Sequence, residues 1–559
     1  MKRRKGIIIS MVIGLIAVIT ISAVNLKDRE FSIIKNLDIF ESLFKELNYF
    51  YVDETDPEKL IQDGINGMLE SLDPYTTFIP ESELDEFAFM TTGKYGGIGS
   101  LIRKSGDYTI IAEPYEGFPA QLAGLMAGDT ILEIDNHSIK GLEIKEVSNR
   151  LKGDPNTKVK LTIKRPGQTK PIGLQVTRKE IKIDNVPYWG MIDKNTGYIY
   201  LSNFTENASN EVINALKGLE SQGAKQIILD IRSNPGGLLI EAVNIANIFV
   251  DKGTEIVSTK GKVNYWDKTY FTQNKPVDTK IPVAVLVNRG SASASEIVAG
   301  SIQDLDRGII VGQRTFGKGL VQTSRQLSYN TKLKVTTAKY YIPSGRCIQA
   351  IDYSHRNEDG SVGHIPDSLI SEFETQNGRK VYDGGGITPD IKVDNKDYKR
   401  IVSTLYSKGY LFDYATYFRI KHDQIPPVDE FEITDEIYQD FINYVASRKF
   451  DYETESDLAL KKLLEKAKDE NYYDKSKEAF DNLEKALNHD LETDLKLVKD
   501  EVSDILLSEI VVRYYYQKGQ IRARLKNDKY LKEAKRTLSD ITLYDSLLNI
   551  DKDKVMVIK

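Results

Sequence analysis

Residues 283–300 read VAVLVNRGSASASEIVAG, and this stretch decides how the middle of the chain is interpreted. A short run of branched apolar residues, typical of a buried strand, ends at Asn288 in a sharp turn, and a helix is expected to begin near Ser293. A serine at such a turn projects its hydroxyl from the sheet edge, where backbone amides and the helix dipole favour negative charge. The stretch therefore predicts a nucleophile turn.

The same residues also allow a purely structural interpretation. Ser293 and Glu296 fit the capping-box pattern S-x-x-E, which stabilises a helix start by about 1 kcal/mol. The turn also lacks the usual G-x-S-x-G form of a nucleophile elbow. From this segment alone, helix capping and catalysis both stay open.

The surrounding sequence alternates strands and helices between residues 185 and 350. Strand-like runs such as YIYL, QIILD and GIIVG are separated by helix-like runs such as NEVINALKGLE and LLIEAVNIANIF. This alternation is typical of a mostly parallel α/β sheet, which binds ligands at the carboxyl ends of its strands. We therefore expect the chemistry of the chain to lie where these strands end.

A serine nucleophile needs a base, and histidine is the common one. His355 and His364 lie downstream in a polar, loop-like stretch, and nothing in the local sequence ties either of them to Ser293. The alternative base is a lysine whose pKa is lowered by burial. Lys318 lies between two glycines before an apolar strand start, where it is either desolvated or an ordinary solvated loop lysine; Gln322 is a candidate to orient it.

A third strand end is LDIRSNPGG, from Leu229 to Gly237. The amides of Gly236 and Gly237 are unhindered donors suited to an oxyanion. The alternative is a tight strand-to-helix turn with no catalytic part.

Together these segments resemble the carboxy-terminal processing proteases, also called tail-specific proteases, which are Ser/Lys peptidases with a crotonase-like α/β core. The resemblance lies in NRGSASASE (288–296), TFGKGLVQ (315–322), TAKYYIPSGRCIQ (337–349) and GGGITPDI (384–391). In that family the nucleophile precedes the lysine by 25 residues, which is the interval from Ser293 to Lys318. The resemblance thus selects Ser293 over Ser291 and Ser295.

The resemblance also implies the roles of the remaining residues. Lys318 would be the general base, and Gln322 would hold it. The amide of Ala294 and that of either Gly236 or Gly237 would form the oxyanion hole, and the choice between the two glycines stays open.

PAQLAGLMAGDTILEIDNHSI (119–139) resembles a PDZ domain, which the family places just before its protease core. Such a domain binds a peptide C-terminus by strand addition, with the carboxylate among backbone amides. GGIGS (96–100) lies where that carboxylate loop belongs. Gly97, Ile98 and Gly99 are therefore the candidate peptide-binding residues.

The expected architecture is an α/β, crotonase-like protease core with an inserted β-rich PDZ domain, an N-terminal helical segment and a C-terminal α-helical extension. The expected boundaries are 1–29 for a signal-anchor or signal peptide, 30–92 for the helical segment, 93–182 for the PDZ domain, 183–395 for the core and 396–559 for the C-terminal helices. Stripes such as Ile437, Phe441, Tyr444 and Val445 predict amphipathic helices there. These helices cap the core, build a homo-oligomer, recruit an adaptor protein or merely extend the structure.

Composition excludes several classes of function. The net charge of −6, with no long basic patch beyond the first five residues, argues against a nucleic-acid partner. The single cysteine, Cys347, rules out an internal disulfide. The five histidines are scattered without an HxxxH or HxH pair, so neither a metal nor another cofactor is expected.

The N-terminus predicts export. Lys2–Lys5 is a basic flank, followed by about 18 apolar residues up to Val24. An uncleaved signal-anchor is favoured over a cleaved signal peptide, and a buried core helix is the remaining alternative. Positive charge before the apolar run favours a cytoplasmic N-terminus. The rest of the chain would then face the periplasm or cell envelope from the inner membrane, or be secreted after cleavage.

The predicted activity is that of an exported serine endopeptidase with a Ser–Lys dyad. Its substrates would be proteins with free C-terminal tails, which the PDZ domain recognises. One alternative is a non-catalytic PDZ-type scaffold that binds tails without cutting them. Another is a different hydrolase or lyase on a crotonase-like core.

Overall fold

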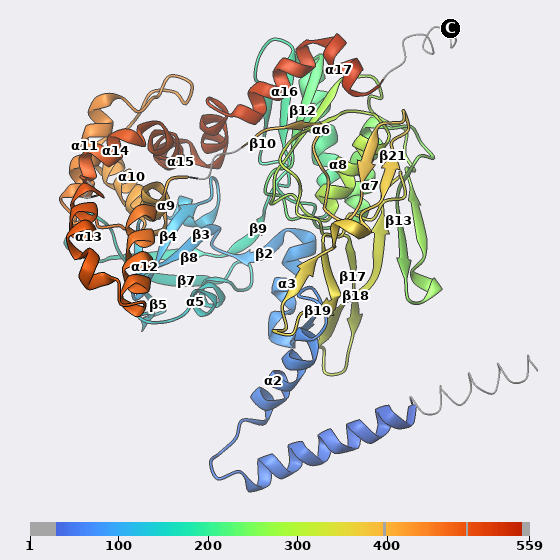
Figure 1. Ribbon diagram of the computed structural model, residues 1–559, viewed down its shortest axis with the longest axis horizontal. Helices are drawn as coiled ribbons and strands as arrows, with labels where there is room; N and C mark the ends of the chain where they lie inside the picture. Colours follow the sequence, from blue (N-terminus) through green and yellow to red (C-terminus); the bar gives the residue numbers. More distant parts are fainter. Residues whose placement is uncertain (1–29, 395–397, 488–489, 550–559) are drawn as a thin grey trace, which may run out of the picture. The chain divides into compact units, whose positions relative to one another are not determined.

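The computed structural model describes residues 30–394, 398–487 and 490–549 (Figure 1). The expected signal-anchor, residues 1–29, lies outside these ranges. Within them, no helix combines the length and the apolar character that crossing a bilayer requires.

Residues 30–78, with residues 333–335, form a compact unit of their own. Residues 30–50 are helical, and α2 follows at Pro57–Glu70. The carboxylate of Asp56 caps α2 by accepting hydrogen bonds from the first-turn amides, and proline opens the helix. Both helices were predicted from the sequence.

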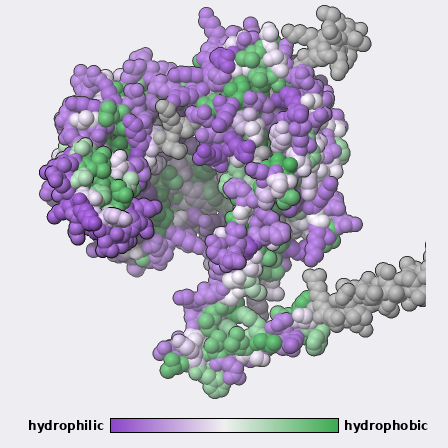
Figure 2. All heavy atoms as spheres, in the orientation of Figure 1, coloured by the Kyte–Doolittle hydropathy of each residue, from purple (hydrophilic) through white to green (hydrophobic). Residues whose placement is uncertain are grey.

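Apolar residues at helical spacing along the first of these helices are exposed to solvent. Ile34, Leu37 and Leu43 keep 60%, 62% and 54% of their surface exposed. Figure 2 colours apolar residues such as these green. The segment is therefore helical, as predicted, but these apolar side chains are not buried among the described residues.

The central sheet has the predicted α/β order. Its strands run in the order β10–β11–β12–β15–β16–β23, with β10 antiparallel to β11 and every other pair parallel. They span Tyr188–Met191, Thr196–Tyr200, Gln226–Asp230, Val283–Val287, Ile309–Gly312 and Ile391–Lys392. Because β12, β15 and β16 are parallel neighbours, the turns that follow them leave from one edge of the sheet.

Side chains of these strands alternate between two buried faces. Ile227, Leu229 and Val285 belong to the core cluster that contains the helices α6, α7 and α8. These helices span Ala208–Ser221, Leu239–Phe249 and Ala294–Asp304. Helix α8, which follows the serine turn, is buried along its whole length.

The opposite face of the sheet is covered by the end of the chain. Helices α16 (Lys529–Ser539) and α17 (Ile541–Leu547) bury Leu531, Leu538 and Tyr544 in one cluster with Ile228 and Leu286 of the sheet. Figure 1 shows these red helices beside the sheet. Helices α16 and α17 therefore cap the core, which is one of the roles considered for the C-terminal region.

A second sheet lies next to the serine helix. It contains β13 and β14 together with β17 and β18, with β18 paired to both β13 and β17. These strands span Glu255–Gly261, Lys268–Phe271, Leu320–Gln326 and Lys332–Tyr341. Tyr340 of β18 is fully buried in the same cluster as α8.

The module before the core is the predicted β-rich domain. Its sheet has the order β3–β4–β5–β7–β8, in which β7 and β8 are an antiparallel pair. These strands span Ser100–Ser105, Tyr108–Pro114, Thr130–Ile134, Lys158–Lys164 and Ile172–Thr177. Two helices, α4 (Pro119–Leu122) and α5 (Ile144–Leu151), complete the module, and β2 (Lys94–Gly97) pairs with β9 (Lys179–Lys182) beside it.

Helices of the C-terminal region form a separate core cluster. Phe441, Tyr444 and Val445 of α11 are buried there, as the predicted stripe requires. Helices α9 to α15 span Arg400–Ser407, Tyr410–Lys421, Asp435–Ala446, Glu455–Asp469, Tyr473–Leu487, Leu491–Leu497 and Lys499–Leu525.

This helical region contacts the β-rich domain. The guanidinium of Arg103 on β3 lies 3.8 Å from the ring centre of Phe412 and 3.8 Å from the carboxylate of Asp413. The side-chain amide of Gln121 donates a hydrogen bond to the hydroxyl of Tyr516, at 3.1 Å. Tyr516 is also where α15 leaves helical geometry, with φ 51° and ψ −162°.

Replacing Leu538 by alanine tests whether α16 is part of the core. Leu538 is 3% exposed, so the substitution leaves a cavity and should cost about 2–5 kcal/mol of unfolding free energy. Ile541→Ala, at a position 56% exposed in the next helix, is the matched control and should change stability by less than about 0.5 kcal/mol. Denaturant unfolding followed by tryptophan fluorescence measures both, and equal effects would contradict the layer described here.

Candidate active site

Ser293 stands at the turn between β15 and α8. Its backbone has φ 57° and ψ −112°, a conformation that L-residues rarely adopt and that places the residue at the N-cap of α8. Ser293 and Glu296 form a capping box. A hydroxyl that accepts a hydrogen bond in such a box keeps its proton for a base, so capping and catalysis are compatible at this position.

The structure distinguishes the three serines of this turn. The hydroxyl of Ser291 donates to the carbonyl of Ile231 at 2.8 Å, and that of Ser295 donates to the carbonyl of Asn234 at 2.9 Å. Both serines are fully buried, whereas Ser293 is only partly buried. Ser291 and Ser295 therefore tie the serine turn to the turn after β12, and Ser293 is the serine that solvent or a substrate reaches.

One carboxylate joins the serine turn to the lysine segment. A single oxygen of Glu296, Oε2, accepts hydrogen bonds from the amides of Ser293 and Lys318, each at 2.9 Å. The two amide nitrogens therefore lie within twice that distance of each other. The other oxygen, Oε1, accepts from the hydroxyl of Thr315 at 2.5 Å and the amide of Gly317 at 2.7 Å.

Glu296 is fully buried, and burial raises its pKa. Its four partners are three backbone amides and the hydroxyl of Thr315, two on each oxygen. These hydrogen bonds favour the carboxylate form, against the effect of burial. Sequence reasoning identified Glu296 only as a capping residue; the remaining signal was a charged side chain inside an otherwise small and apolar helix.

Tyr340 connects the same two residues from the other side. Its hydroxyl donates to the carbonyl of Lys318 at 2.6 Å and lies 3.2 Å from the carbonyl of Ser293. Its backbone amide donates to the carbonyl of Gly319 at 3.0 Å. Burial raises the pKa of the phenol well above its ordinary value, so it stays a donor. No sequence pattern indicated this role.

The backbone around Lys318 is held along its length. The amide of Phe316 donates to the carbonyl of Ser291, and the amide of Gly319 donates to the side chain of Gln349. Lys318 itself is half-buried. The lysine segment is therefore an ordered turn.

Gln322 and the two candidate histidines lie in different places. Gln322 is on β17, and its side-chain nitrogen donates to the hydroxyl of Thr336 on β18 at 3.2 Å. His355 and His364 are exposed on the hairpin of β19 (Ile351–Arg356) and β20 (Val362–His364), where His355 contacts Asp352. Within the described ranges, neither histidine forms a hydrogen bond or an ion pair with the serine turn.

The glycine turn after β12 packs directly on the serine turn. A Cβ atom built on Gly236 would lie 2.8 Å from the amide nitrogen of Ala294 and 2.9 Å from Cβ of Ser293, so no larger residue fits. The amide of Ala292 donates to the carbonyl of Asn234 at 3.0 Å. The two turns therefore form one packed unit.

The amides at this junction are not equivalent. The amide of Gly236 donates to the side-chain oxygen of Asn234 at 2.9 Å. For the amides of Gly237 and Ala294, no acceptor is found in the described part of the protein. Gly237 and Ala294 therefore supply the donors that a bound oxyanion could use.

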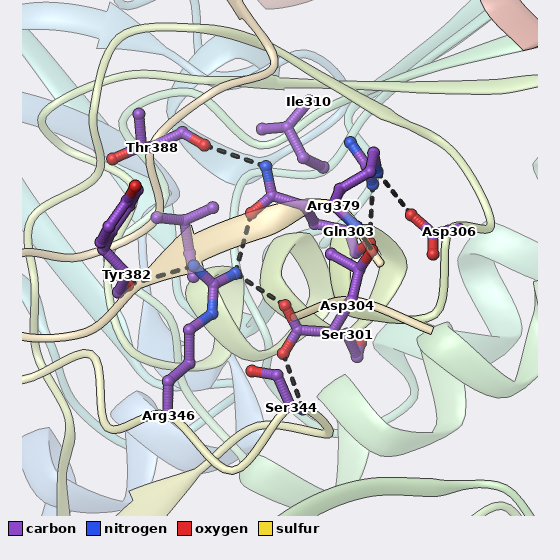
Figure 3. A network of polar contacts seen from close by, with 12 residues as sticks. Ser301, Gln303, Asp304, Asp306, Ile310, Ser344, Arg346, Arg379, Tyr382 and Thr388 are labelled. Carbon is purple, nitrogen blue, oxygen red and sulfur yellow. Dashed lines mark hydrogen bonds and ion pairs between the residues drawn. The ribbon is translucent and has the colours of Figure 1, made fainter. Parts of the chain in front are cut away.

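The far end of α8 is fixed by buried ion pairs (Figure 3). The guanidinium of Arg346 donates to Asp304 at 2.7 Å and to the side-chain oxygen of Gln303 at 2.8 Å. Arg379 binds Asp306 and, at 2.6 Å, Asp390. Arg346 and Asp390 come from the segments TAKYYIPSGRCIQ and GGGITPDI, so both segments brace the helix that carries Ser293.

The candidate carboxylate loop has the geometry of a strand-addition site. The carbonyls of Ile98 and Gly99 accept hydrogen bonds from the amides of Ala120 and Tyr115, at 2.7 and 3.0 Å. Gly99 has φ +73°, and a Cβ there would lie 2.6 Å from Phe118. The following strand, β3, is the last in its sheet and pairs with β4 alone among the described strands, which leaves an edge for a peptide.

An accessible serine at the strand ends of an α/β core is the arrangement of a serine peptidase. Family models agree: residues 195–355 match peptidase family S41, residues 110–165 match a PDZ domain, and residues 401–538 match the probable PDZ-protease C-terminal helical domain. The chain belongs to peptidase family S41, among the carboxy-terminal processing proteases. The predicted family and fold class are thereby confirmed.

Individual relatives carry the same description. A carboxy-terminal-processing protease of Bartonella bacilliformis is 38% identical over 321 residues, covering 57% of this chain and 73% of the relative. A probable CtpA-like serine protease of Staphylococcus aureus is 33% identical over 421 residues, covering 73% and 79%. Among solved structures, the photosystem II D1 C-terminal processing protease is 30% identical and covers 64% of this chain and 92% of its own, with a TM-score of 0.36.

Glu296→Gln should loosen the serine and lysine turns together. An amide side chain places an NH₂ group among four donors, and each buried donor left unpaired costs about 1–3 kcal/mol. We expect faster hydrogen exchange at the amides of Gly317 and Lys318, measured by mass spectrometry. Glu358→Gln, at an exposed position on the β19–β20 loop, is the control; exchange as slow as in that control would contradict the bridging role.

Glu113 gives the contact between the PDZ domain and the C-terminal helices a pH dependence. Burial, and then the nearby carboxylate of Glu509, raise the pKa of Glu113 to about 7, while Arg513 and Arg524 act in the opposite direction. One of its oxygens is buried without a hydrogen-bond partner among the described residues. Tyr115, which neighbours Glu113, also titrates above its ordinary range, at about 12.

The sign of this dependence follows from the raised pKa. The stabilising contribution of neutral Glu113 is fully present below its unfolded-state pKa of 4.5 and is lost as pH rises through about 7. Glu113→Gln should therefore have the melting temperature of the wild type at about pH 4 and a higher melting temperature than the wild type at about pH 8.5. Thermal unfolding at both pH values measures this. Glu116→Gln, an exposed neighbour, is the control, and a difference independent of pH would contradict the assignment.

Proposed function

We propose that this chain is an exported serine endopeptidase that cleaves protein substrates recognised through their C-terminal tails. One observation carries the proposal: Ser293 and Lys318, 25 residues apart, share one oxygen of Glu296 through their amides and the hydroxyl of Tyr340 through their carbonyls. These two shared hydrogen-bond partners hold the two backbones together, which keeps a nucleophile and a base close to each other.

In the proposed reaction, neutral Lys318 accepts the proton of Ser293, and the serine oxygen attacks the peptide carbonyl. Lysine ordinarily titrates near 10.4, so the mechanism depends on a pKa lowered by burial and substrate binding. Lys318 then returns the proton to the leaving amine, and water releases the acyl group from Ser293. Gln322 donates through its nitrogen to Thr336, so its oxygen is the end suited to hold the lysine.

The tetrahedral oxyanion would be bound by the amides of Ala294 and Gly237. Gly237 is preferred over Gly236 because the amide of Gly236 already donates to Asn234. Removing one such donor commonly costs about 3 kcal/mol of transition-state stabilisation.

Substrate tails would add as a strand to the open edge of β3. The tail carboxylate would bind at Gly97, Ile98 and Gly99, where the loop carbonyls are turned to the protein and fixed by Tyr115 and Ala120. The basic flank and apolar run at the start of the sequence support export with a membrane anchor. The catalytic and tail-binding regions would then face the cell envelope.

Ser293→Ala and Lys318→Ala in the full-length protein test the dyad. Both variants should lose peptide cleavage while keeping tail binding, because neither side chain lies in the PDZ domain. Cleavage of a tagged substrate is followed by mass spectrometry, and tail binding by fluorescence anisotropy with a labelled peptide. An amidated peptide serves as the control for recognition of the free carboxylate.

His355→Ala and Ser354→Ala are matched controls, because both residues lie on an exposed hairpin with a Ser–His–Asp contact set. They should retain full activity. Activity that survives Lys318→Ala but is lost in His355→Ala would replace the lysine by a histidine base. Tail binding by the wild type without any cleavage would favour the non-catalytic scaffold.

A further inference from the structure

Helix α16 of the C-terminal region begins beside the catalytic strand ends. Its N-cap residue, Asp528, uses one carboxylate oxygen to accept the amides of Tyr530 and Leu531, at 2.8 and 3.1 Å. The other oxygen accepts a hydrogen bond from the guanidinium of Arg232 at 2.6 Å. One carboxylate thus starts the helix and joins it to the core.

Arg232 is the second residue after strand β12. Its guanidinium also donates to both oxygens of Asp230, at 2.9 and 3.0 Å through Nε, and lies 4.9 Å from the ring centre of Tyr530. Asp230 is fixed in turn by the hydroxyl of Tyr198 at 2.7 Å. A planar guanidinium held on two sides by carboxylates and on one face by a ring has a single orientation.

The backbone next to Arg232 leads directly into the two turns of the active site. Ser233 has φ 57°, and its amide donates to the side-chain oxygen of Asn288 at 2.8 Å. The side-chain nitrogen of Asn288 donates back to the hydroxyl of Ser233 at 3.0 Å. Asn288 opens the serine turn, and Gly237 lies four residues beyond Ser233. The position of Arg232 is therefore transmitted to both.

We propose that Asp528 is a positioning residue for the peptidase reaction, so that the C-terminal helical region supplies part of the support of the active site. It acts through Arg232 on the turn that ends in Gly236 and Gly237. The proposal rests on the proposed function, because the turn matters for turnover only if its amides bind the oxyanion. It assigns α16 a role beyond covering the apolar face of the sheet.

Asp528→Asn separates this role from helix capping. Asparagine is an equally good N-cap, so α16 keeps its start, while the charge that holds Arg232 is lost. We expect kcat to fall by about 10- to 100-fold with KM unchanged, as for a small displacement of a catalytic group. Asp528→Glu keeps the charge and should recover part of this loss.

Lys535→Gln is the matched control, because it removes another ion pair between the same helix and the same core. Lys535 lies 2.9 Å from Asp193, in the loop before β11, away from the catalytic strand ends. This variant should keep the kcat of the wild type, and it should lose less stability than Asp528→Asn because the pair of Lys535 and Asp193 is more exposed than the pair of Arg232 and Asp528. Equal kcat values for the two variants would overturn the proposal.

Hydrogen exchange at residues 233–237 provides the second measurement. Asp528→Asn should raise exchange there at least several-fold over Lys535→Gln, even without a substrate. If the wild type cleaves no peptide, the proposed function is wrong. Hydrogen exchange still tests the support of the turn in that case, and exchange at residues 233–237 that is unchanged in Asp528→Asn would contradict the positioning role. If Ser293-dependent cleavage is intact and Asp528→Asn changes neither kcat nor exchange, only the positioning role is wrong.

Discussion

The candidate active site is held together by the buried carboxylate of Glu296. Removing a carboxylate from water is costly, and the protein compensates with four donors that come from two separate segments of the chain. Because the donors come from both segments, neither turn can move away without removing hydrogen bonds from the buried carboxylate. The same interaction explains the fully buried helix α8 and the small side chains of SASAS, since Glu296 must approach two backbones closely.

Much of this arrangement is visible in the sequence, because it depends on local patterns. The strand-helix alternation predicted the parallel sheet, and the run VAVLVN followed by small residues predicted the strand, turn and helix around Ser293. The pattern S-x-x-E, however, describes contacts within four residues, and the bonds of Glu296 to Thr315 and Gly317 span about twenty. The choice between Gly236 and Gly237 depends on where one side chain, that of Asn234, points, which no pattern encodes.

The packing of the C-terminal region could not be predicted from the sequence, for a different reason. Strands β12 and β15 are apolar on both faces, as Ile227 and Ile228 illustrate, so a second covering layer is required. The sequence does not say which segment provides it. The charged helices after residue 400 read as a separate extension, and α9, α10, α11 and α14 share a core of their own with most of α15. Among the described residues, the end of α15, with Ile521, packs on the sheet together with α16 and α17.

The supports of the candidate site come from different parts of the chain. Helix α8 is fixed at its start by Glu296 and at its end by the buried pair of Arg346 and Asp304, so the serine and lysine turns are ordered without a substrate. The glycine turn is fixed by Ser295 of the serine turn and, through Arg232, by ion pairs with Asp230 and with Asp528 at the start of α16. Helix α16 directly follows α15, whose hinge-like Tyr516 contacts the PDZ residue Gln121. Through Arg232 and Asp528, the glycine turn is therefore linked to a helical region that also contacts the PDZ domain.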